Sequence, residues 1–145
     1  MTTYMISMDD QASEADTQAL IRSLVSYNDT QAEKENWRGL ALFIRNSRGE
    51  IMGGFSGYTH WGWLFIGHLW VAERLRGQGY GTKLVERVER EAARRGCRHA
   101  YLDTFDFQAP GFYEKLGYEV FGSLEDFPAD HTRYFLKKRL LLPTI

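Results

Sequence analysis

The residues best suited to chemistry stand in one glycine-rich stretch between an apolar run and a helical pattern. Arg76 is followed by glycines at positions 77, 79 and 81. Because glycine has no side chain, successive backbone N–H groups can point at one anion, and the start of a helix adds the positive end of its dipole. Arg76 can add a charge-assisted hydrogen bond to the same anion. The stretch therefore predicts a cradle for a pyrophosphate.

The spacing of these glycines excludes the two most familiar nucleotide-binding loops. A dinucleotide-binding loop requires Gly-x-Gly-x-x-Gly, but Thr82 stands three residues after Gly79. A P-loop requires Gly-Lys and then Ser or Thr, but Gly81 is followed by Thr82 and only then by Lys83. The remaining pattern is Arg-x-x-Gly-x-Gly, starting at Arg76 and directly following an apolar strand pattern. It resembles the acetyl-CoA signature of the GNAT superfamily of N-acetyltransferases, in which this loop holds the cofactor's pyrophosphate.

A second segment resembles the same family. Residues 112–118 read Phe-Tyr-Glu-Lys-Leu-Gly-Tyr, which is similar to the Phe-Tyr-x-x-x-Gly-Phe/Tyr segment that closes the cofactor site in GNAT enzymes. The resemblance implies that Tyr113 lies beside the thioester sulfur and protonates the thiolate as CoA leaves, a role that depends mostly on placement. The segment alone is more typical of a core tyrosine on a short helix. Beside the glycine-rich stretch, it favours the catalytic role.

The amine that attacks the thioester must first lose a proton, because an amine is protonated in neutral water. His68 is the candidate base, since it stands three residues before Val71, where many GNAT enzymes carry a glutamate, and histidine exchanges a proton near neutral pH. A lone histidine in an apolar strand is also typical of a core residue. Glu73, Asp103 and Asp106 are alternatives, as is an ordered chain of water molecules.

The resemblance also implies how the rest of the cofactor is held. Backbone groups of Leu69 and Val71 would pair with the pantetheine arm as an added strand does, and a backbone N–H near Val71 would polarise the thioester carbonyl. One residue departs from the family pattern: Asp106 stands seven residues before Tyr113, where asparagine is common, so it could repel phosphates or serve the acceptor amine. The expected cofactor-binding residues are Leu69, Trp70, Val71, Arg76, Gly77, Gln78, Gly79, Tyr80, Gly81, Thr82, Asp106 and Tyr113.

Hydrophobic periodicity predicts the elements that position these residues. We expect a short strand over 4–8, a helix ending near 25–27, strands over 39–45, 50–58 and 63–71, a helix from 82 to about 95, a strand over 98–104, a short helix over 109–117, a strand over 118–121, a loop over 122–131 and a strand over 133–138. A strand, a helix and a strand in succession imply a right-handed βαβ unit with parallel strands. With the resemblance, this predicts an α/β (α+β) GNAT fold whose mixed, mainly antiparallel sheet holds a central βαβ cofactor unit.

Size and charge limit the classes of function. The 145 residues, 43% of them hydrophobic, fit one domain over 1–145. The net charge of −1, with both signs interspersed, argues against nucleic acid or an anionic membrane as a partner. Because neither a signal-peptide pattern nor a membrane-spanning run is present, we expect a cytoplasmic protein.

Cysteine and histidine usage argues against a metal or a covalent route. Cys97 is the only cysteine, and the four histidines lack the spacing of helical metal ligands. The helix predicted from 82 to about 95 is about 21 Å long. Cys97, which follows it, therefore falls at the end of the sheet opposite the glycine-rich stretch. We therefore expect no metal and no acyl-cysteine intermediate.

These features predict an N-acetyltransferase that moves the acetyl group of acetyl-CoA to a primary amine of a small molecule by direct attack in a ternary complex. Glu125, Asp126 and Asp130 would suit a cationic acceptor, although a charged surface loop explains them equally simply. Aromatic residues at 58, 61 and 63 could line an acceptor pocket or belong to the core.

Two other functions stay open at this stage. One is a non-catalytic acyl-CoA-binding or regulatory module, and the other is an enzyme that acetylates a protein N-terminus or lysine. The aromatic final strand and the leucines at 140–142 are compatible with a homodimer.

Overall fold

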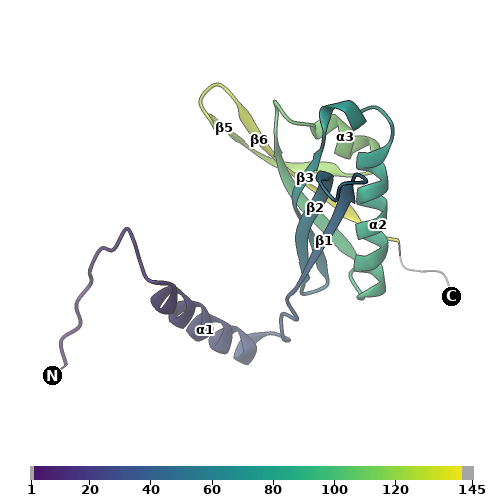
Figure 1. Cartoon of the computed structure of the whole chain (residues 1–145). Coiled ribbons are helices and arrows are strands. Elements are labelled where there is room, and N and C mark those ends of the chain that lie inside the picture. The colour runs from purple at the N-terminus through teal and green to yellow at the C-terminus, as the bar shows by residue number, and fades with distance from the viewer. Residues whose placement is uncertain (1, 142–145) are drawn as a thin grey trace. The chain divides into compact units, whose positions relative to one another are not determined.

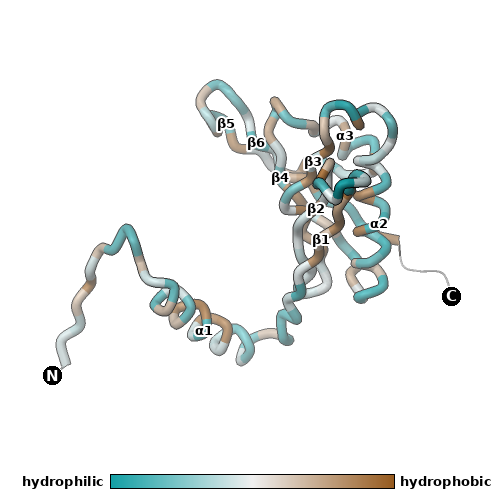
Figure 2. Tube along the Cα trace, viewed as in Figure 1, coloured by the Kyte–Doolittle hydropathy of each residue, from teal (hydrophilic) through white to brown (hydrophobic). Residues whose placement is uncertain are grey.

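The structure is a computed structural model that describes residues 2–141, and the chain divides into two compact units, residues 1–35 and 36–145. The first unit contains α1 (Glu14–Gln31), which begins at Ser13, whose hydroxyl accepts a hydrogen bond from the N–H of Asp16 at 3.1 Å. Figure 2 shows apolar residues along α1. The large apolar side chains of this helix are exposed, and they are Leu20, Ile21, Leu24, Val25 and Tyr27.

Two predictions for this unit need correction. The strand predicted over 4–8 is wrong: in the described part of the chain this segment pairs with no other strand, and its side chains are exposed. Alternation of apolar residues cannot make a strand without a neighbour to take its backbone hydrogen bonds. The helix also runs past Tyr27 to Gln31, because Thr30 bonds its hydroxyl to the carbonyl of Tyr27 at 2.6 Å instead of ending the helix.

The second unit is a six-stranded sheet with two helices (Figure 1). Its strand order is β1-β2-β3-β4-β6-β5, and of the described neighbours only β3 and β4 run parallel. This confirms the mixed, mainly antiparallel sheet with a central βαβ unit. The elements are β1 (Arg38–Arg45), β2 (Ile51–His60), β3 (Trp63–Val71), the 3-10 helix η1 (Glu73–Leu75), α2 (Tyr80–Arg94), β4 (His99–Phe105), α3 (Pro110–Lys115), β5 (Glu119–Glu125) and β6 (Thr132–Arg139).

The core lies between α2 and one face of the sheet. Apolar residues recur along α2 at helical intervals and are buried, while most of its charged residues are exposed. They pack with alternate residues of the central strands, which point to the same face. The principal members are Leu64, Ile66, Val85, Val88, Leu102 and Leu136.

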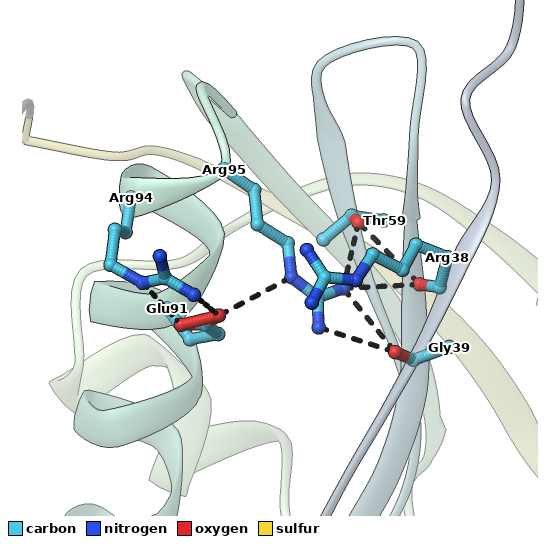
Figure 3. A network of polar contacts seen from close by, with 6 residues as sticks. All are labelled: Arg38, Gly39, Thr59, Glu91, Arg94 and Arg95. Carbon is cyan, nitrogen blue, oxygen red and sulfur yellow. Dashed lines mark hydrogen bonds and ion pairs between the residues drawn. The ribbon is translucent and has the colours of Figure 1, made fainter.

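The C-terminal end of α2 is tied to the sheet by Arg95 (Figure 3). The Nη1 group of Arg95 donates to Thr59 Oγ1 at 3.0 Å and to the carbonyls of Arg38 and Gly39 at 3.2 and 3.3 Å. Its Nε lies 3.5 Å from Glu91 Oε1, an ion pair within the helix. The side chain is only 10% exposed, so one guanidinium fixes the end of α2 against β1 and β2.

Two further observations concern the ends of the chain and its helices. The leucines at 140–142, which are compatible with a homodimer, are described only in part: Leu140 is buried, Leu141 is exposed, and residue 142 lies outside the described residues. Among residues 2–141, no helix is long and apolar enough to span a bilayer.

Candidate active site

The central strands β3 and β4 pair along only part of their length. The parallel ladder joins Trp63–Ile66 to His99–Leu102, and the described pairing ends there. Beyond it, β3 stays paired with β2 as far as Val71, while β4 stays paired with β6 as far as Phe105. The two strands therefore leave a split in the sheet, with backbone groups on both sides that have no partner strand.

Two contacts show which backbone groups of β3 point into this split. The N–H of Ala72 donates to the carbonyl of Met52 on β2 at 2.8 Å, whereas the carbonyl of Val71 accepts from Arg76 Nε at 3.0 Å. Because backbone groups alternate in direction along a strand, Leu69 and Val71 point away from β2. These are the two residues whose backbone the sequence predicts to pair with the pantetheine arm. Trp70 pairs with Gly54 on β2 instead, and its side chain is exposed.

The glycine-rich stretch leads into the N-terminus of α2 at the same end of the sheet. Gly77 and Gly79 have φ angles of +75° and +85°, a backbone conformation that other residues adopt only with strain. Gly79 caps α2 without a side-chain hydrogen bond, and Lys83 is the first residue to bond back into the helix, to the carbonyl of Gly79 at 3.0 Å. The N–H groups of the three preceding residues, 80–82, stand ahead of that bond and can bind an anion.

The polar side chains of this stretch hold the loop in shape. Arg76 uses its Nε on the carbonyl of Val71 and is exposed, which leaves the terminal nitrogens of the guanidinium facing solvent. Gln78 donates to the carbonyl of Arg74 at 2.9 Å. Tyr80 opens the helix, with its ring 5.4 Å from the ammonium of Lys83. The loop thus presents backbone amides and cations on one surface.

The structure brings the two family-like segments into contact. A Cβ built on Gly81 would lie 3.2 Å from the ring of Phe112, so a larger residue at this position would have to displace that ring from the first turn of α2. Tyr113, the next residue, is 7% exposed and belongs to the core cluster on the helix face of the sheet. Burial raises the pKa of its hydroxyl to about 12, so Tyr113 is protonated throughout the neutral and mildly alkaline range.

His68 lies on the other face of the sheet, at a cavity of about 530 Å³. The cavity has an aromatic wall in which Trp37 and Phe65 flank Tyr58, at ring distances of 5.6 and 5.0 Å. The sequence predicted Tyr58 for a pocket, but it missed Trp37 and Phe65. The full lining is Trp37, Gly39, Leu40, Ala41, Ser56, Gly57, Tyr58, Phe65, Gly67 and His68.

Two glycines shape the strands below this cavity. A Cβ at Gly57 would lie 2.1 Å from the carbonyl of Phe65, and one at Gly67 would lie 2.9 Å from the carbonyl of Ser56. The register between β2 and β3 shifts at this point. The glycine at position 57 was therefore the feature of the sequence that could have predicted this close approach of β2 and β3.

The alternative acidic residues are engaged within the protein. Asp103 accepts two hydrogen bonds from Arg133, at 2.9 and 2.6 Å. Asp106 accepts from the N–H of Thr132 at 2.9 Å and lies 2.7 Å from His131 Nδ1. The Thr132 N–H, assisted by His131, holds the pKa of Asp106 below its ordinary value. Asp106 therefore stays a carboxylate that ties β4 to the start of β6.

The remaining predicted residues lie elsewhere. Glu73 is exposed in η1, and Glu125, Asp126 and Asp130 are exposed around the turn between β5 and β6. Cys97 is buried beyond the C-terminal end of α2, where burial raises the pKa of its thiol.

The aromatic residues at 61 and 63 lie away from the cavity. Trp63 stacks on His99 at 4.5 Å, and Trp61 lies 5.9 Å from the ring of His60, so neither lines the cavity. Within residues 2–141, no group of three or more His, Cys, Asp or Glu side chains is arranged to hold a metal ion.

Known proteins resemble the chain over most of its length. The model of the acetyltransferase (GNAT) family matches residues 9–118. Blasticidin-S acetyltransferase of Streptomyces morookaense is 41% identical over 101 residues, covering 69% of this chain and 74% of the relative. An acetyltransferase of Agrobacterium fabrum is 38% identical over 127 residues, covering 87% and 93%. A crystal structure of an acetyltransferase from Bacillus cereus superimposes with a TM-score of 0.83 at 34% identity, covering 92% of this chain and 98% of the other.

Proposed function

This chain belongs to the GNAT family of acetyltransferases, and on that premise we propose that it transfers the acetyl group of acetyl-CoA to a primary amine of a small molecule. One observation carries the proposal. Beyond the β3–β4 ladder, which ends at Ile66 and Leu102, the buried Tyr113 belongs to the core on the helix face of the sheet, and His68 borders a cavity on the other face. A thioester placed in the split would meet an acid from one side and an amine from the other.

The donor is acetyl-CoA in this proposal. The N–H groups of Tyr80, Gly81 and Thr82 bind its pyrophosphate, and Arg76 adds charge from the surface. The backbone of Leu69 and Val71 takes the pantetheine arm as an added strand, and a backbone N–H near Val71 polarises the thioester carbonyl. The CoA-binding roles of Gly77, Gln78 and Gly79 are to shape the loop that presents these groups.

Tyr113 acts as the acid. The amine nitrogen bonds to the carbonyl carbon, the carbon–sulfur bond breaks, and the sulfur takes up a proton from the Tyr113 hydroxyl. The Tyr113 phenolate regains a proton from water as CoA leaves. With a pKa of about 12, the phenol is a weaker acid than a thiol, so proton transfer alone gains no free energy. The contribution of Tyr113 is an O–H donor that packing in the core holds beside the sulfur.

His68 acts as the base for the incoming amine. It borders the cavity, is exposed, and lies on the strand that also carries Leu69 and Val71. Asp103 and Asp106 are less suited to this role, because each already accepts two hydrogen bonds from β6 or from the residues beside it. The imidazole takes the proton that the amine gives up.

The acceptor is a small molecule with a flat or apolar part beside its amine. The cavity of about 530 Å³ has the size of a small-molecule pocket, and its aromatic wall suits a ring or a cation stacked on Tyr58. A relative named for the acetylation of blasticidin S supports this class of acceptor. In this proposal the amine attacks the thioester directly in a ternary complex, because His68 of the cavity lies on the same strand as Leu69 and Val71.

The test is release of free CoA, detected with a thiol reagent, across a panel of small amines and of peptides with free N-termini or lysines. We expect release to depend on one class of small amine. Tyr113→Phe should bind acetyl-CoA as tightly as the unchanged protein in calorimetry, while kcat falls at least about 100-fold. Release with peptides alone would exclude a small-molecule acceptor, and failure to bind acetyl-CoA would exclude the assignment of residues 69–82.

A further inference from the structure

Behind Tyr113 lies a polar network that the proposed reaction does not use. The hydroxyl of Tyr118 donates to Glu89 Oε2 at 2.7 Å, and Lys138 Nζ donates to both oxygens of the same carboxylate at 3.0 and 3.1 Å. The ammonium of Lys138 also lies 5.4 Å from the centre of the Tyr118 ring. Glu89 belongs to α2, Tyr118 directly precedes β5, and Lys138 belongs to β6. The network therefore joins three separate elements.

Tyr118 is coupled to Tyr113 in two ways. Its N–H donates to the carbonyl of Tyr113 at 3.1 Å, which closes the turn after α3. The two rings meet edge to face, with centres 5.9 Å apart and planes at 76°. Tyr118 is 3% exposed, so its ring forms part of the wall against which Tyr113 packs. A shift of Tyr118 would move both the backbone and the ring of Tyr113.

The burial of Glu89 explains why this geometry is tight. Its side chain is 14% exposed, and a carboxylate removed from water is costly unless donors surround it. Tyr118 and Lys138 supply those donors. Burial, reinforced by the Glu89 charge, raises the pKa of Tyr118, so its hydroxyl stays a donor. A buried polar network in which every group has a hydrogen-bond partner favours one packing of the surrounding side chains over alternative packings.

We propose that Glu89, Tyr118 and Lys138 are positioning residues that hold the Tyr113 hydroxyl in register with the N-terminus of α2. Glu89 lies on the same helix as residues 80–82, the proposed pyrophosphate site, so one rigid helix fixes the acid relative to the phosphates. The inference rests on the proposed function, because it assumes that Tyr113 is the acid. Its consequence is that the network acts on kcat through Tyr113 alone.

The test is a double-mutant cycle on Tyr118 and Tyr113 with kcat and KM for acetyl-CoA as readouts. Tyr118→Phe removes one hydroxyl and leaves the ion pair of Glu89 and Lys138 intact. We expect kcat to fall about tenfold, because misplacement of a reacting group by a fraction of an ångström is costly, with KM within about twofold. In the Tyr113→Phe background, Tyr118→Phe should have no further effect on kcat, since no hydroxyl remains to be positioned.

A control variant separates positioning from loss of stability. Arg95→Gln removes contacts of the same kind at the far end of α2 and should lower the melting temperature while leaving kcat unchanged. Equal effects of Tyr118→Phe in both backgrounds, or no effect in either, would overturn the positioning role. If Tyr113→Phe alone leaves kcat intact, the assigned acid is wrong and the positioning role fails with it; CoA release by the unchanged protein reports separately on the acetyl transfer.

Discussion

The two ends of α2 differ in how their polar groups are hydrogen-bonded. At the C-terminal end, the guanidinium of Arg95 bonds to three acceptors on β1 and β2, as Figure 3 shows. At the N-terminal end, Gly79 caps the helix without a side-chain hydrogen bond, and the first-turn N–H groups remain available. We call the first end of α2 the closed end, because the chain itself bonds to it, and the second the open end, because it has no side-chain cap.

This difference separates the part of the helix that stabilises the fold from the part that serves the proposed reaction. Helix ends normally have their N–H groups satisfied by a Ser, Thr, Asp or Asn cap. A glycine in that position gives up such a cap and leaves the positive end of the helix dipole uncovered. Changes at the closed end should therefore alter stability, and changes at the open end should alter the binding of acetyl-CoA.

The largest effect should come from Arg95→Leu at the closed end. We expect the free energy of unfolding to fall by about 3 kcal/mol, because the buried hydroxyl of Thr59 and the carbonyl of Gly39 lose their common donor. Denaturant titration measures this loss. The affinity of the remaining folded protein for acetyl-CoA should stay unchanged in calorimetry.

Arg94→Leu is the matched control for this variant. Arg94 pairs with the same Glu91, but its side chain is 69% exposed, and surface ion pairs contribute at most about 0.5–1 kcal/mol. If both leucine variants lose the same stability, the closed end does not depend on Arg95.

Strongly alkaline pH should act through Tyr113, because a phenol loses its proton there whereas the guanidinium groups of the closed end keep theirs. Burial raises the pKa of Tyr113 from 10 to about 12, so the folded state binds its proton more tightly than the unfolded chain. Its contribution is fully present below pH 10 and is lost as the pH rises to about 12. The free energy of unfolding should then fall by about 2 kcal/mol across that window, measured by denaturant titration at several pH values.

Tyr113→Phe supplies the control for the pH experiment. The variant should lose clearly less stability over the same window, with the rest of the loss coming from Tyr118, whose pKa is also raised by burial. An unchanged pH profile in the variant would mean that Tyr113 ionises as freely in the folded protein as in the unfolded chain.

Local pattern predicted most of the fold because each element carries its own period. The strand over 63–71 was predicted with the bounds that the structure has, since a long apolar run between turns leaves little choice. The first strand failed because a strand exists only through its neighbour. The strand over 118–121 was predicted too short, as β5 continues to Glu125 by pairing with Thr132. Such pairing is a contact between distant residues that periodicity does not contain.

The candidate site divides in the same way. The glycine loop was predicted from spacing and Tyr113 from the family resemblance, because both motifs lie in consecutive residues; their roles stay predictions. The cavity brings Trp37 beside Phe65, and the network brings Glu89 beside Lys138. These two contacts depend on strand register and helix packing, so no short stretch of sequence predicts them.

The finest test compares two glycines with similar backbone geometry. Gly79 at the open end has a φ of +85°, and Gly49 in the turn between β1 and β2 has a φ of +80°; a Cβ at either position would meet nothing within 4 Å. Changing either one to alanine should lower the free energy of unfolding by about 1 kcal/mol, the usual penalty for a non-glycine residue with a left-handed backbone. Only Gly79→Ala should also weaken acetyl-CoA binding, by about tenfold in calorimetry, because the strained loop no longer aims the N–H groups of α2 at the pyrophosphate. Equal affinities in the two variants would show that the loop shape at Gly79 does not matter for the cofactor. The missing side-chain cap of α2 would then not be explained by acetyl-CoA binding.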